Sequence, residues 1–211
     1  EPLSNLDAKL RNQMRAELIK LRERIDTTFM YVTHDQTEAM TLGDRIVVMK
    51  DGTVQQIGTP QDVYDHPSNV FVAGFIGTPQ MNFYDAELVR EAGGSYTVRV
   101  GDAQVVPSAE KQARLTANGV GSQSITLGVR PEHIALSDEG QNVLNGVVDV
   151  VELMGSTVNL HVNAYGHDSV IVAQAASLME RAGIVKTGDA VSFSFSGNTV
   201  HFFSRETGLN L

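Results

Sequence analysis

The sequence predicts a chain of two parts, an α/β part over residues 1–80 and a β-rich part over residues 81–211. Up to Gly77, apolar residues at helical spacing alternate with short apolar runs typical of strands. After Thr78-Pro79, short alternating segments are separated by Gly, Asn and Asp, which is typical of barrels and sandwiches. We place the boundary near residues 78 to 83.

The first predicted element is a helix of about five turns. Its apolar residues recur every three or four positions and so form one stripe along the helix. The stripe consists of Leu6, Leu10, Met14, Leu18, Leu21 and Ile25.

Residues 27–33 (Thr-Thr-Phe-Met-Tyr-Val-Thr) predict a buried strand of a parallel sheet, because they are β-branched or aromatic with little polar alternation. Asp35 then stands three residues before Glu38, a pattern typical of a capping box that starts a helix through about Leu42. His34 is therefore expected between the carboxyl end of a strand and a helix.

Residues 45–50 and 53–57 predict two strands joined by Asp51-Gly52, a strong two-residue hairpin signal. Next, Thr59-Pro60 supplies a cap and a first-turn proline for a short helix that ends near His66-Pro67.

The β-rich part contains two stretches of similar size, roughly residues 84–136 and 144–204, which we interpret as two barrel-like halves. This part shows little helical spacing except around residues 175–182.

Composition restricts the function classes. The formal charge of -9 and the aromatic content of 6% argue against nucleic acid as a partner. There is no cysteine and no apolar run of membrane-spanning length, so we expect a cytoplasmic chain. The first residues lack an initiator Met and a signal peptide, so we expect the chain to start within a domain. No metal site is predicted, because five histidines lack ligand spacing: His66, His133, His161, His167 and His201.

Two short segments carry the strongest functional signal. Residues 1–7 (Glu-Pro-Leu-Ser-Asn-Leu-Asp) and 31–35 (Tyr-Val-Thr-His-Asp) together resemble the end of the Walker B motif, the D-loop and the H-loop of ABC-type ATPases. The resemblance is closest to the maltose and glycerol-phosphate importer ATPases. It continues through residues 71–77 and 206–211, and so spans nearly the whole chain.

This resemblance implies a role for five residues. Glu1 matches the carboxylate that orients or deprotonates the attacking water, and His34 matches the histidine that contacts the γ-phosphate, for which we expect Nε2. Ser4, Asn5 and Asp7 match the D-loop, which couples two ATP sites across a dimer.

The residues alone leave simpler interpretations open. Glu1 could be a solvated terminal residue, and His34 a satisfied surface residue. Ser4 and Asp7 could cap the first helix, a role compatible with the D-loop assignment.

Residues 128–134 and 146–162 resemble the TOBE domain, an OB-like β-barrel attached to these ATPases. The resemblance implies contacts between two copies of the subunit and, in some members, binding of a regulatory protein. An ion pair between Arg130 and Glu132 is as good an interpretation as ligand contact, so no ligand site is predicted there.

The resemblance further implies a homodimer bound to two transmembrane permease subunits, peripheral on the inner face of the plasma membrane. ATP and Mg²⁺ are implied for the parent protein. The sequence contains neither a glycine-rich phosphate loop nor a Leu-Ser-Gly-Gly-Gln signature, so we expect a C-terminal remnant that is inactive alone. The strand at 28–33 would then lack parallel neighbours and leave apolar faces uncovered.

Three functions from different classes are compatible with these features. The first is the ATP-hydrolysing subunit of an importer for sugar or sugar phosphate. The second is a stand-alone regulatory, dimerising or ligand-sensing TOBE module. The third, an oligonucleotide-binding OB protein, is disfavoured by the charge.

Overall fold

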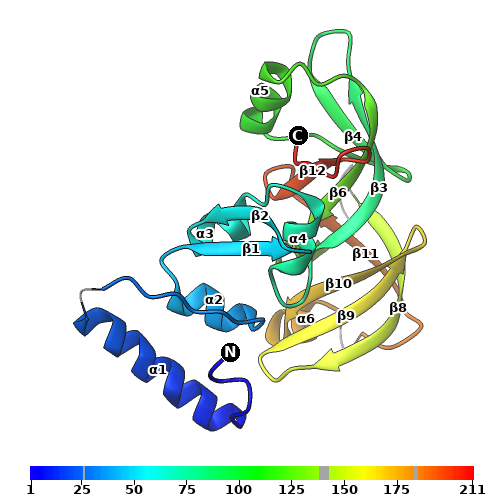
Figure 1. The fold of residues 1–211 in the computed structure, drawn as a ribbon. Helices are drawn as coiled ribbons and strands as arrows, with labels where there is room; N and C mark the ends of the chain where they lie inside the picture. The colour runs from blue at the N-terminus through cyan, green and yellow to red at the C-terminus, as the bar shows by residue number, and fades with distance from the viewer. Residues whose placement is uncertain (26, 138–142, 183–184) are drawn as a thin grey trace. The chain divides into compact units, whose positions relative to one another are not determined.

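The computed structural model describes residues 1–25, 27–137, 143–182 and 185–211 (Figure 1). The chain divides into two compact units, Glu1–Ser68 and Asn69–Leu211. This division follows contacts in space and does not test the domain boundary predicted near residues 78 to 83, which stays a prediction.

The first unit contains the predicted helices and hairpin, drawn from blue to cyan in Figure 1. Its elements are α1 (Ala8–Arg24), α2 (Gln36–Leu42), β1 (Ile46–Lys50), β2 (Thr53–Gly58) and α3 (Pro60–Asp65). The caps lie where the sequence placed them. The side chains of Asp7, Asp35 and Thr59 accept hydrogen bonds from the backbone N–H groups of Leu10, Glu38 and Asp62, respectively.

Helix α1 keeps its predicted stripe but buries no residue in this unit. Leu21 and Ile25 are close to half exposed. Polar contacts attach the helix to α2: Arg22 donates to the carbonyl of Leu42 at 2.7 Å and pairs with Asp44 at 3.2 Å. A cation at the last carbonyls of a helix is favourable because they carry partial negative charge.

The predicted strand at residues 27–33 is wrong, because no strand is assigned there. A strand forms only beside another strand that takes up its backbone hydrogen bonds, and within the described ranges no strand pairs with this segment. Phe29, Met30 and Val32 are 46%, 91% and 65% exposed, so the expectation of uncovered apolar faces is confirmed.

The hairpin β1–β2 is antiparallel, as predicted. Asp51 and Gly52 have φ of 49° and 76°. Positive φ at both central residues is the geometry of the type I′ turn, which matches the twist of the flanking strands.

The second unit is β-rich, as predicted, and consists of two five-stranded sheets with antiparallel pairing, drawn from green to red in Figure 1. The first sheet has the order β12 (Val200–Ser204), β6 (Gln123–Val129), β3 (Asn82–Arg90), β4 (Tyr96–Val100) and β5 (Ala103–Val105). The second has the order β10 (His167–Gln174), β9 (Thr157–Ala164), β8 (Leu144–Leu153), β11 (Ala190–Phe195) and β7 (Ile134–Leu136). The unit also contains α4 (Val70–Phe75), α5 (Ala109–Ala117), the short 3₁₀-helix η1 (Pro131–His133) and α6 (Ala175–Ala182).

Both sheets follow the same chain order. Three consecutive strands, a helix and a fourth strand that pairs with the first occur as β3-β4-β5-α5-β6 and again as β8-β9-β10-α6-β11. The fifth strand of each sheet comes from the other stretch: β7 follows β6 but pairs with β11, while β12 follows β11 but pairs with β6. This exchange joins the two stretches, and one buried apolar cluster contains residues of both sheets.

Asn82 connects the two sheets. Its side chain is buried, donates from Nδ2 to the carbonyl of Val170 at 2.8 Å, and accepts the N–H of Val170 on Oδ1 at 2.7 Å. The amide thereby takes the place of a neighbouring strand for one residue of β10.

Arg130 follows β6 and is buried with 1% exposure. Its Nη1 donates to the carbonyl oxygens of Ala73 and Ile76, at the end of α4. The guanidinium therefore satisfies carbonyl groups that the helix leaves without intrahelical partners. These hydrogen bonds connect α4 to the end of β6.

We expect Asn82→Ala to lower the free energy of unfolding of the second unit by about 1 to 3 kcal/mol, because it leaves the partly buried N–H and C=O of Val170 without the Asn82 partner. Urea denaturation measures the change. Asn163→Ala is the matched control, since the Asn163 amide makes an exposed contact to Asp168, and a loss under about 0.5 kcal/mol is expected. Equal losses in the two variants would contradict the role of Asn82.

Candidate functional site

The candidate site lies in the first unit, where the N-terminal turn meets His34, two residues before α2. Nδ1 of His34 lies 2.6 Å from Oε1 of Glu1, although the two residues are 33 positions apart. The side chains are 73% and 46% exposed, so the pair faces solvent. The two residues predicted to be catalytic are thus in direct contact.

The contact determines what each group can do. The hydrogen bond from His34 lowers the pKa of the Glu1 carboxyl below its usual range and so further favours the ionised form. An ionised carboxylate can accept a proton or a hydrogen bond from water. With Nδ1 engaged, Nε2 is the ring nitrogen left for another group, and it donates to an anion when the ring is doubly protonated.

The three predicted D-loop residues lie in or beside the same turn. The Ser4 hydroxyl donates to the carbonyl oxygen of Glu1 at 3.0 Å and closes the turn. Asn5 is exposed within it. Asp7 caps α1 through Leu10 N–H at 2.9 Å, which confirms the cap interpretation for Asp7. The same interpretation is wrong for Ser4, whose hydroxyl donates to the Glu1 carbonyl instead. The D-loop roles of all three residues stay predictions.

A small pocket of about 290 Å³ lies beside the pair. It is lined by Ser4, Arg11, Thr33, His34, Asp35 and Glu38. Arg11 is held there by Asp35 at 3.7 Å and by the carbonyl of Leu6 at 3.0 Å. This space is lined by donor groups and by the carboxylates of Asp35 and Glu38. The hydroxyls of Ser4 and Thr33 already donate to the Glu1 carbonyl and to Glu38.

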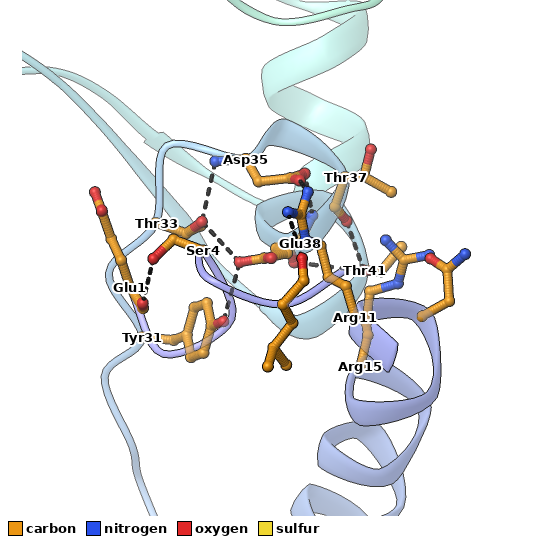
Figure 2. Close-up of polar contacts among 12 residues, drawn as sticks. Glu1, Ser4, Arg11, Arg15, Tyr31, Thr33, Asp35, Thr37, Glu38 and Thr41 are labelled. Atoms are coloured by element: carbon orange, nitrogen blue, oxygen red, sulfur yellow. Dashed lines mark hydrogen bonds and ion pairs between the residues drawn. The ribbon is translucent and has the colours of Figure 1, made fainter. Parts of the chain in front are cut away.

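Sequence analysis missed the most buried polar group of this site. Glu38 is 3% exposed, and its Oε2 accepts hydrogen bonds from the hydroxyls of Tyr31 at 2.9 Å and Thr33 at 2.7 Å (Figure 2). The pKa of Tyr31 is raised to about 12, mainly by partial burial and in second place by the hydrogen bond to Glu38. Its phenol therefore remains a donor at neutral pH. The capping pattern identified Glu38 as a helix start, but nothing in it indicated two hydroxyl partners upstream.

Two domain families match the second unit. The TOBE domain matches residues 127–203, and the MalK OB fold domain matches residues 77–134. The two matches meet over residues 127–134, the turn from one sheet to the other.

Curated relatives match along the whole chain. The oligosaccharides import ATP-binding protein MsmX of Bacillus subtilis (strain 168) is 41% identical over 100% of this chain and 56% of its own length. The sn-glycerol-3-phosphate import ATP-binding protein UgpC of Ruegeria pomeroyi is 46% identical over 99% of this chain and 54% of its own. The ABC transporter ATP-binding protein YcjV of Escherichia coli (strain K12) is 42% identical over 98% and 54%. The chain therefore spans about half the length of the curated relatives it matches.

Among solved structures, the cytoplasmic molybdate-binding protein ModG aligns with 57% of this chain at a TM-score of 0.46 and 14% identity, which carries no functional argument.

No helix within the described ranges is long and apolar enough to cross a membrane.

We expect the Glu1 carboxyl in the 211-residue chain to titrate below the usual range of glutamate, because His34 stabilises its ionised form. Carboxyl ¹³C NMR against pH measures this, with His34→Ala returning Glu1 to the usual range. Since the folded-state pKa is the lower one, the contact stabilises the unit above the usual glutamate pKa and is lost as the pH falls through the folded value. An unchanged midpoint in His34→Ala would contradict the contact.

Proposed function

On the premise that the chain belongs to the family of sugar and glycerol-phosphate import ATP-binding proteins, we propose that it is part of the ATP-hydrolysing subunit of an ABC importer for sugars or sugar phosphates. The observation that carries this proposal is the 2.6 Å contact between Glu1 and His34. Two motifs that are far apart in the sequence supply one carboxylate and one imidazole to one place.

In this proposal the two residues divide the work. Glu1 orients or deprotonates the water that attacks the γ-phosphate. His34 donates from Nε2 to the γ-phosphate oxygen, while its Nδ1 is engaged by Glu1.

The remaining roles concern the nucleotide and its surroundings. Ser4, Asn5 and Asp7 relay between the ATP sites of two subunits. In the pocket beside His34, Arg11 pairs with Asp35, so His34 is the donor that we assign to the phosphate. Mg²⁺, when bound with ATP, neutralises phosphate charge. We assign it no ligand in this chain.

The proposal includes the partners that such a subunit needs. The full-length protein forms a homodimer, binds two transmembrane permease subunits and lies on the inner face of the plasma membrane. The TOBE and OB domains contribute to contacts between subunits and could receive a regulatory protein.

We expect Glu1→Gln in the full-length protein to lower ATP turnover by about 100-fold or more, because the amide cannot act as a base. Phosphate release at saturating ATP measures it. Glu17→Gln is the matched control, since the Glu17 carboxylate contacts only the exposed Lys20 among the described residues. Unchanged turnover in Glu1→Gln would remove the assigned role.

The 211-residue chain itself is expected to show no ATP turnover, because its sequence contains no glycine-rich phosphate loop. If the proposal is correct, the protein expressed from its native gene has an intact mass nearly double the 22.8 kDa of this chain. An intact mass of 22.8 kDa would instead favour the stand-alone regulatory module.

A further inference from the structure

Glu38 is a buried carboxylate with an unusual pair of donors. The hydroxyls of Tyr31 and Thr33 both reach the same oxygen, Oε2. Moving a carboxylate out of water is costly unless hydrogen bonds compensate it. Figure 2 shows the two hydroxyls on the segment that precedes α2, converging on Glu38 in the first turn of that helix.

Thr33 closes a ring of hydrogen bonds around His34. Its Oγ1 donates to Glu38 and accepts the N–H of Asp35 at 3.0 Å. The Asp35 side chain in turn accepts the N–H of Glu38 at 3.1 Å. His34 stands between Thr33 and Asp35, so its backbone is held on both sides while its side chain stays 73% exposed.

This ring matters because strand pairing does not hold the segment. Residues 27–34 are not part of any ladder in the described ranges, and the apolar side chains of Met30 and Val32 are largely exposed. The hydroxyl contacts of Tyr31 and Thr33 are therefore the side-chain anchors that fix the segment to α2 immediately before His34.

We propose that Glu38 is a positioning residue for the reaction: through Thr33 and Tyr31 it places His34 where the imidazole reaches Glu1. The inference rests on the proposed function for its catalytic consequence only. The geometric consequence, the contact between His34 and Glu1, is measurable without ATP.

The first experiment follows the Glu1 carboxyl by ¹³C NMR in the 211-residue chain. Thr33→Val removes the hydroxyl at nearly constant shape, and Glu38→Gln weakens the acceptor of both hydroxyls. Both are expected to return the Glu1 pKa toward its usual range, whereas Thr33→Ser, which keeps the hydroxyl, preserves the lowered value. Thr37→Val, at an exposed position of α2, is the matched control.

Backbone amide signals of α2 show whether each variant keeps the helix. If Glu38→Gln unfolds it, Thr33→Val still tests the inference, because the Asp35 cap of α2 remains. A lowered Glu1 pKa in Thr33→Val with α2 intact would overturn the inference.

The second experiment uses ATP turnover of the full-length protein. Thr33→Val is expected to lower kcat about 10-fold or more with little change in KM, and Thr33→Ser to restore it, because a small displacement of a positioned group costs rate. Loss of turnover in Glu1→Gln with normal kcat in Thr33→Val would overturn the inference alone. Normal turnover in Glu1→Gln would overturn the proposed function, while the NMR result would still decide the contact.

Discussion

Backbone N–H and C=O groups need partners, and in this chain the supply of partner strands decides which segments become regular structure. In the second unit the strands find neighbours because β7 and β12 each pair in the sheet of the other stretch. Where β10 meets β3, the Asn82 amide serves as a one-residue partner. In the first unit only β1 and β2 pair, and the apolar segment before His34 has no strand beside it in the described residues.

The same constraint explains why the candidate site contains a buried carboxylate. A segment outside any sheet needs other anchors. Hydrogen bonds from hydroxyls to a carboxylate are stronger than hydrogen bonds between neutral groups. Glu38 supplies this acceptor from the first turn of α2, where its own N–H is already capped by Asp35. Such a network fixes one local geometry only if all its polar groups have hydrogen-bond partners. Here the network holds the backbone on both sides of His34 at the start of α2.

The two units also use arginine in the same way. Arg22 binds the last carbonyl of α2, and Arg130 binds the carbonyl oxygens at the end of α4. The sequence alone leaves open an ion pair between Arg130 and Glu132. In the structure Nη1 of Arg130 donates to two carbonyl oxygens at the end of a helix.

The sequence by itself determined the local elements: the Asp7, Asp35 and Thr59 caps, the Asp51-Gly52 turn and the β-rich character of the second part. Each depends on residues within a few positions, so short patterns suffice. It also named Glu1 and His34, by resemblance. The tertiary structure alone decided that residues 27–33 form no strand, that two strands exchange sheets and that Glu38 is buried under two hydroxyls. The first two features depend on which distant segments pair, and a local pattern does not contain the partner. The third involves nearby residues, but it depends on how the segment before α2 folds onto the first turn of that helix.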